Sequence, residues 1–467
     1  MEKLEALSPL DGRYANKTES LRNYFSEEAL INYRIAVECE YLIFVLKNLN
    51  LSRDMRPLSA NKELSLRSIY SDRENNALTV KKIEFSGMEG LPATNHDVKA
   101  VEYYLRKVLK EKGLEKYCAF LHFGLTSEDI NNIAYSLMIS AALKNEIIPA
   151  LDKILKNLKE LSVKNAAIPL LARTHGQPAV GTTFGKEFRV FYERILRKRK
   201  RLSSCKLNVK INGAVGNYNA LNAAYPKIDW ISFSQKFISA LSRRFSAPLE
   251  CNLYTTQIEN HDSWIEIFTE IKHLNRITAS FCRDIWRYIS DELIIQIPSK
   301  GEIGSSTMPQ KINPIDFENA EGNLGLACSL FSFFEEKLPE SRLQRDLSDS
   351  TVQRSIGSAF GYSLIAYNSL LKGLSKIKIS QENSEKSLYE HPEVYAEAVQ
   401  TILRRELYPN AYEKLKDFSR GKKITMKKWK SLVSSLKISK KAKADILAIL
   451  NKPYIGLAEK LAIKNLK

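Results

Sequence analysis

Residues 147–161 read IIPALDKILKNLKEL, and this stretch decides the fold class. Its apolar residues recur in alternating steps of four and three, which is the period of an α-helix that buries one face. The stripe consists of Ile147, Leu151, Ile154, Leu158 and Leu161. Two later segments repeat the pattern, at Phe184, Phe188, Phe191 and Ile195 and at Trp264, Ile267, Phe268, Ile271 and Leu274. Long helices that pack side by side are therefore predicted.

Two further candidates, residues 314–338 and 350–374, bring the number of long helices to about five, which is enough for a bundle. Alternating strand patterns are scarce, the best being residues 83–85, and the Gly-rich phosphate loops of nucleotide-binding α/β folds are missing. We therefore predict an all-α protein. Its three predicted domains are an N-terminal helical domain over residues 1–122, a central long-helix bundle over residues 123–375, and a Lys-rich C-terminal helical domain over residues 376–467.

The composition is that of an ordinary globular protein, with 44% hydrophobic and 27% charged residues among 467. A chain of this length exceeds the roughly 250 to 300 residues that one hydrophobic core serves. The sequence has neither a signal-peptide core nor an apolar run of about 18 residues, so a cytoplasmic protein without a membrane span is predicted. Its six cysteines are scattered, which predicts reduced, buried thiols rather than disulfides or a metal site.

The net charge of +18 is unevenly distributed along the chain. Residues 405–467 carry 17 Lys and Arg against 5 Asp and Glu. Lysine-covered helical faces explain this tail better than RNA binding, because no basic motif with interleaved aromatic residues accompanies it. Nucleic acid is thus not an expected partner, whereas the remaining positive charge suits a small anionic substrate.

Residues 301–314 read GEIGSSTMPQKINP and form the most informative polar segment. Its glycines, adjacent serines and lysine precede Asn313-Pro314, which opens a predicted helix. Backbone amides and hydroxyls can therefore meet an anion near a positive helix end. A flexible Gly/Ser linker is the alternative, but the run from Met308 to Pro314 is too particular for a generic spacer. We predict an anion-binding loop.

The segment GSSTMPQKINP resembles the signature of the fumarase, aspartase and argininosuccinate lyase superfamily. Four more segments make the chain similar to the bacterial adenylosuccinate lyase family, from about residue 8 to past residue 420: SPLDGRY at 8–14, TNHDVKAVEYYL at 94–105, TSEDINN at 126–132 and LQRDLSDSTVQR at 343–354. The resemblance implies that the central bundle assembles into the helical core of a homotetramer with active sites shared between subunits. It implies no cofactor and no metal.

The reaction implied by the resemblance is a β-elimination that releases fumarate. The substrates would be adenylosuccinate, which gives AMP, and the succinylated aminoimidazole carboxamide ribotide (SAICAR), which gives its amide (AICAR). Ser305 would take the proton from the carbon beside a succinyl carboxylate, and His175 would protonate the departing nitrogen from the opposite face. A serine needs nearby positive charge and amide dipoles to act as a base. Whether Ser305 or Ser306 is the base stays open.

Further roles follow from the same resemblance. Lys311 and Asn313 would stabilise the carboxylate that gains charge in the carbanion. Glu318 would pair with His175, and His96 would be a second active-site histidine. The residues implied to bind substrate are Arg13, Tyr14, Asn95, His96, Asp97, Thr126, Ser127, Gln257, Ser306, Lys311, Ile312, Asn313, Asn319, Arg345, Ser350, Thr351, Val352, Gln353 and Arg354. The arginines suit phosphate through bidentate hydrogen bonding.

Several of these features also have plainer interpretations. The run from Thr126 to Asp129 is typical of a helix N-cap, which is compatible with substrate binding. Arg13 and Tyr14 are close to the N-terminus and would in the plainer interpretation only dock that arm. Structural roles are predicted for the remaining histidines, His122, His261, His273 and His391. At the level of function, the alternatives are another fumarate-releasing lyase and a basic nucleic-acid-binding protein that keeps the fold without activity.

Overall fold

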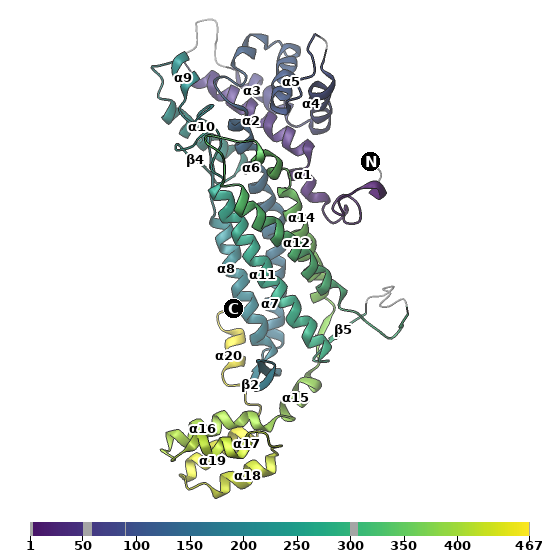
Figure 1. The fold of residues 1–467 in the computed structure, drawn as a ribbon, viewed down its shortest axis with the longest axis vertical. Helices are drawn as coiled ribbons and strands as arrows, with labels where there is room; N and C mark the ends of the chain where they lie inside the picture. The colour runs from purple at the N-terminus through teal and green to yellow at the C-terminus, as the bar shows by residue number, and fades with distance from the viewer. Residues whose placement is uncertain (1–2, 50–57, 89, 299–306, 467) are drawn as a thin grey trace. The chain divides into compact units, whose positions relative to one another are not determined.

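The computed structural model describes residues 3–49, 58–88, 90–298 and 307–466. Helices dominate these residues, so the predicted all-α class is confirmed (Figure 1). The described chain divides into two compact units. The first contains residues 1–151, 198–276 and 322–366, and the second contains residues 152–197, 277–321 and 367–467. The predicted division into three domains remains a prediction.

The first unit contains nine helices of its own among the described residues. They are α1 (Arg22–Phe25), α2 (Glu27–Asn48), α3 (Ala60–Ile69), α4 (Arg73–Ser86), α5 (Asp97–Glu111), α6 (Ser127–Ala142), α9 (Asn219–Ala224), α10 (Trp230–Phe245) and α13 (Ser348–Gln353). Five further helices contribute residues to both units: α7 (Ile148–Lys164), α8 (Phe184–Ser204), α11 (Asp262–Ser290), α12 (Ile315–Lys337) and α14 (Ile356–Leu374). The C-terminal part of the second unit adds α15 (Gln381–Tyr389), α16 (Ala396–Arg405), α17 (Ala411–Ser419), α18 (Met426–Ser435), α19 (Lys440–Leu450) and α20 (Ala458–Ile463).

The long helices bury the stripes that the sequence predicts. Ile147, Leu151, Ile154 and Leu158 are each fully buried, and the stripes of α8 and α11 are buried as well, whereas Leu161 at the end of the first stripe is only half-buried. In the first unit the ring of Phe268 on α11 lies 5.4 Å from that of Phe331 on α12. Aromatic packing of this kind adds to the burial of apolar area that drives the helices together.

Two smaller cores lie outside the long helices. In the first unit, α2, α3, α4 and α5 pack against one another over buried side chains such as Ile35, Leu42, Val80 and Leu105 (Figure 1). In the second unit, α16 to α19 enclose Trp429, whose indole nitrogen donates to the carbonyl of Pro392 at 2.7 Å. The lysines of α18 and α19 are mostly exposed, as expected for lysine-covered faces.

Strands are short and occur in three two-stranded sheets among the described residues. β1 (Pro169–Thr174) and β2 (Gln177–Thr183) form an antiparallel hairpin in the second unit. The other pairs are the parallel β3 (Leu207–Val209) and β4 (Leu249–Cys251) and the antiparallel β5 (Ile294–Gln296) and β6 (Ile377–Ile379). No described helix combines the length and the apolar character needed to cross a membrane.

Three local predictions need correction. Residues 83–85 belong to the end of α4 rather than to a strand, because Ile83 continues the buried helical stripe of Ala77 and Val80, whereas Phe85 is exposed. The helix expected over residues 350–374 is two helices, since α13 ends at Gln353 and α14 begins at Ile356. The six cysteines are all free thiols, but Cys118, Cys205 and Cys251 are only half-buried.

Candidate active site

The first polar segment of the candidate site is the start of α6. Thr126 is the N-cap residue, and its backbone amide donates to the Asp129 carboxylate at 2.8 Å in a capping box. Such a box satisfies amides that the first helical turn leaves without partners. The predicted cap is therefore confirmed. It fixes Thr126 and Ser127, both half-buried, at the positive end of the helix.

Asp129 also anchors this helix end to two distant parts of the first unit. Its carboxylate lies 2.8 Å from the ammonium group of Lys210, and both side chains are fully buried. Lys210 in turn donates to the carbonyls of Gly213 at 2.9 Å and Gln257 at 3.0 Å. The backbone of Gln257, a predicted substrate residue, is thereby tied to the cap of α6.

Asp97 and Arg354, which the resemblance placed in one site, form an ion pair. Arg354 donates to Asp97 at 2.9 Å, and the buried Arg34 reaches the same carboxylate oxygen at 2.8 Å. Burial alone would raise the pKa of Asp97, but the charges of Arg34 and Arg354 and the amide of Val98 outweigh it and lower the pKa to about 2. Asp97 is thus held as a carboxylate.

Arg345 and Gln257 form the second pair of predicted substrate residues that the structure brings together. The guanidinium of Arg345 donates to the side-chain carbonyl of Gln257 at 3.3 Å. On its other side it lies 3.4 Å from the carboxylate of Glu128, the residue after Ser127. The side chain of Arg345 is 17% exposed, so part of the guanidinium remains accessible to a ligand.

Helix α13 carries the remaining substrate residues of the first unit. Ser350 and Val352 are half-buried and Thr351 is exposed, whereas Gln353 is buried. The Gln353 amide nitrogen lies 3.2 Å from Asp349 Oδ2 and 3.2 Å from His261 Nε2. Gln353 therefore holds α13 in place from within the protein.

The other predicted residues of the first unit lie on exposed segments. Arg13 is exposed and Tyr14 half-buried in the turn before α1, which leaves both of their interpretations open. Asn95 adopts a left-handed backbone conformation with φ of 45°. His96 is exposed, and its ring nitrogen Nδ1 caps α5 by accepting from the amide of Lys99 at 3.2 Å.

His175 lies at the turn of the β1–β2 hairpin in the second unit. His175 and Gly176 both have positive φ, 53° and 74°, and the flanking Thr174 and Gln177 are paired. Two positive φ values between paired strands define a type I′ turn, whose twist matches that of the strands. The turn exposes the imidazole of His175, as a proton donor to a ligand requires.

The second unit also contains the described part of the signature loop. Lys311 and Ile312 are exposed, and Asn313 is half-buried just before α12. On α12, the carboxylate of Glu318 accepts from the indole of Trp286 at 3.0 Å, and the side chain of Asn319 accepts from Ser369 at 2.7 Å. The pairing of Glu318 with His175 remains a prediction, and Ser305 and Ser306 lie outside the described residues.

Five buried residues that support these groups were not predicted as part of the site: Arg34, Glu128, Lys210, His261 and Asp349. Glu128 and Asp349 lie inside the quoted motifs and His261 lies in a polar stretch, but only the packing shows that they meet. His261, interpreted as structural, lies with Glu128 and Asp349 in a buried group whose ligand atoms are within 4.8 Å of one another. Among the described residues, this group has the spacing of a metal site.

Comparison with known proteins identifies the family. The lyase family matches residues 12–328, and the adenylosuccinate lyase C-terminal family matches residues 341–455. An adenylosuccinate lyase of Legionella pneumophila (strain Corby) is 46% identical over 464 residues, which cover 98% of each chain. The chain belongs to the adenylosuccinate lyase family. It is accordingly a carbon–nitrogen lyase of the fumarase and aspartase superfamily.

Other relatives agree with this assignment to the adenylosuccinate lyase family. The adenylosuccinate lyase of Escherichia coli (strain K12) is 42% identical over 460 residues, covering 98% of both chains. That of Dictyostelium discoideum is 44% identical over 469 residues, covering 98% of this chain and 97% of its own. Among solved structures, a fumarate lyase of Mesorhizobium sp. BNC1 matches with a TM-score of 0.74 at 16% identity, covering 96% of this chain and 97% of its own. A 3-carboxy-cis,cis-muconate lactonizing enzyme of Pseudomonas putida matches with a TM-score of 0.71 at 19% identity, covering 96% of both chains. These two structures support the fold alone.

Proposed function

We propose that this protein releases fumarate by β-elimination from adenylosuccinate, giving AMP, and from SAICAR, giving AICAR. The observation that supports the substrate class is the network at the start of α6. There, Gln257 contacts Arg345 and Asp97 contacts Arg354, although these residues come from three separate segments of the sequence. Guanidinium groups that are held by carboxylate and amide partners but remain partly accessible suit a phosphate-bearing ligand.

The chemistry requires a base and an acid on opposite faces of the substrate. Ser305 takes the proton from the carbon beside one succinyl carboxylate, and the electron pair forms the double bond of fumarate. His175 gives a proton to the departing nitrogen, so charge and protons balance. Lys311 and Asn313 stabilise the carboxylate that carries extra negative charge between the two steps.

The assembly belongs to the same proposal. We infer a cytoplasmic homotetramer in which each active site takes His175 and Ser305 from different copies of the chain. If inactive His175→Ala and Ser305→Ala chains are mixed and allowed to reassemble, about a quarter of the sites then regain both residues. Recovery of fumarate release in the mixture is the expected result. A mixture that forms mixed tetramers but stays inactive contradicts the shared site.

The substrate assignment is tested with the purified protein. Fumarate release from adenylosuccinate and from SAICAR is expected, whereas argininosuccinate and aspartate remain unconverted. Arg345→Ala is expected to lose most turnover of both phosphate-bearing substrates. The matched control is Arg342→Ala, since Arg342 is 86% exposed and pairs only loosely with Asp346 at 3.8 Å. Unchanged turnover by Arg345→Ala, or preference for argininosuccinate or aspartate, contradicts the proposed substrate.

A further inference from the structure

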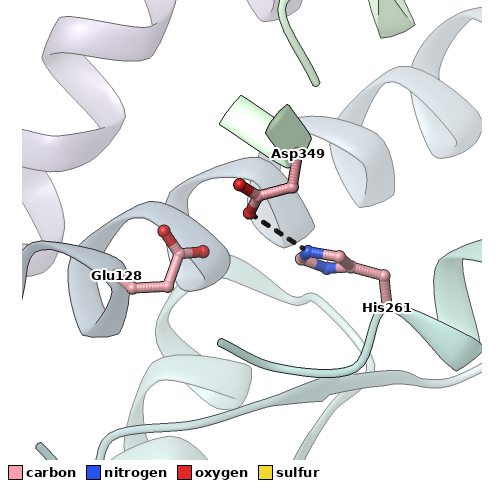
Figure 2. A group of neighbouring side chains, drawn as sticks. All are labelled: Glu128, His261 and Asp349. Atoms are coloured by element: carbon pink, nitrogen blue, oxygen red, sulfur yellow. Dashed lines mark ion pairs between the residues drawn. The ribbon is translucent and has the colours of Figure 1, made fainter. Parts of the chain in front are cut away.

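Glu128, His261 and Asp349 converge from three parts of the first unit. Glu128 is in the first turn of α6, His261 precedes α11, and Asp349 is in the first turn of α13. Figure 2 shows the carboxylate of Asp349 directed at the imidazole, with Glu128 facing both. The imidazole Nε2 lies 3.9 Å from Asp349 Oδ2, and the three residues are at most 3% exposed. Three ionisable side chains are thus withdrawn from water together.

The hydrogen bonds of this cluster are incomplete among the described residues. Glu128 Oε1, His261 Nδ1 and Asp349 Oδ1 are buried and have no partner. The opposite carboxylate oxygens are occupied, since Glu128 Oε2 faces Arg345 at 3.4 Å and Asp349 Oδ2 accepts from Gln353 at 3.2 Å. The partnered oxygens therefore connect the cluster to the predicted substrate residues Arg345 and Gln353.

The positive charge that faces this cluster is the guanidinium of Arg345, which lies 3.4 Å from Glu128 Oε2. It would repel a metal ion held among the three residues, so the metal-like spacing alone does not define a metal site. Burial raises the pKa of Glu128, and the charge of Arg345 opposes this rise. Glu128 and Arg345 are therefore coupled by charge as well as by distance.

Several contacts hold His261 in place. Its ring stacks on the indole of Trp264 with centroids 4.4 Å apart, and its backbone amide donates to Glu259 at 2.7 Å. Its φ of 63° is a conformation that non-glycine residues adopt only when the surroundings impose it. With its Nε2 3.2 Å from the Gln353 amide nitrogen and 3.9 Å from Asp349 Oδ2, this imidazole holds α13 in place.

We propose that His261 is a positioning residue for the substrate site, acting through Glu128 on Arg345 and through Asp349 and Gln353 on α13. The inference rests on the proposed substrate site, because Arg345 and α13 are placed there by the family resemblance. When the imidazole is removed, Glu128 and Asp349 repel each other and Arg345 loses its fixed direction. Substrate binding weakens, while the acid and the base, which belong to other segments, are unaffected.

The test compares His261→Gln with the milder Asp349→Asn, in case the first variant does not fold. For either variant we expect KM for adenylosuccinate to rise about tenfold, as for a misaligned charge-assisted hydrogen bond, with kcat within about threefold of the wild type. The control is Ser363→Ala, which removes a buried hydrogen bond of 3.0 Å to Asn275 in the same unit. It lowers the melting temperature and leaves KM unchanged.

Two results overturn the inference. One is a KM within twofold of the wild type in the folded variants. The other is a loss confined to kcat, which would place His261 in the chemistry rather than in positioning. Both are separable from failure of the proposed function, because that failure appears in the wild-type protein as absence of fumarate release from adenylosuccinate.

Discussion

Replacing Lys210 by methionine tests how strongly the buried ion pair with Asp129 supports the first unit. The change keeps the apolar stem and removes an ammonium group that is fully buried. It leaves the carboxylate of Asp129 without its counter-charge and takes the donor from the carbonyls of Gly213 and Gln257. Breaking a buried pair by removing one partner costs about 3 to 5 kcal/mol.

The corresponding shift in melting temperature follows from the size of the chain. The unfolding entropy of 467 residues is about 1 kcal/mol per kelvin, so the loss corresponds to about 3 to 5 °C. Calorimetry at equal protein concentrations measures it, because the stability of an oligomer depends on concentration. KM should rise as well, since the backbone of Gln257 loses its tether.

Lys206→Met is the matched control for this experiment. Lys206 is 63% exposed and pairs at the surface with Glu250, which is 49% exposed. Exposed pairs contribute about 0 to 1 kcal/mol, so the melting temperature should change by about 1 °C or less. If Lys210→Met and Lys206→Met melt within a degree of each other, the buried pair does not hold the cap of α6 to Gln257 as argued.

Two further predictions concern the hairpin and the acid limit of stability. Gly176→Ala forces a side chain into a left-handed conformation at φ of 74°, which costs about 1 to 2 kcal/mol. The variant should fold but release fumarate about tenfold more slowly than the wild type. An unchanged rate would show that the turn geometry does not position His175. The pKa of Asp97 is lowered to about 2 in the folded protein, whereas it is about 3.9 in the unfolded chain. The contribution of Asp97 to the free energy of unfolding is therefore complete above about pH 4 and disappears as the pH falls towards 2. The difference in urea midpoint between the wild type and Asp97→Asn should therefore be smaller at pH 3 than at pH 6, and a constant difference contradicts the assigned pairing with Arg34 and Arg354.

The long helices could be predicted because their apolar stripes repeat over several turns. Burial of the stripes of α7, α8 and α11 then follows from helix geometry. The break between α13 and α14 could not be predicted, because the sequence of residues 350–374 is compatible with one continuous helix and the interruption depends on packing. Strand prediction at residues 83–85 failed because a short apolar run fits either period.

The site was predictable only where a motif marks it. The segments that carry Asp97, Gln257, Arg345 and Arg354 were found through the family resemblance, and the structure brings these residues into direct contact. Lys210 and His261 belong to no such motif, and a lone lysine or histidine usually has only a structural role. Their positions follow from tertiary contacts between residues that are far apart in the sequence, for example the contact between Asp129 and Lys210, which are 81 positions apart.

The opposed acid and base are tested most directly by measuring fumarate release from adenylosuccinate for the wild type, Ser305→Ala and His175→Ala. A well-placed general acid or base contributes a factor of roughly 10² to 10⁴. We predict that each substitution lowers kcat by a factor of at least about 10² while the protein remains folded and assembled. A near-normal rate in either variant would contradict the role assigned to that residue.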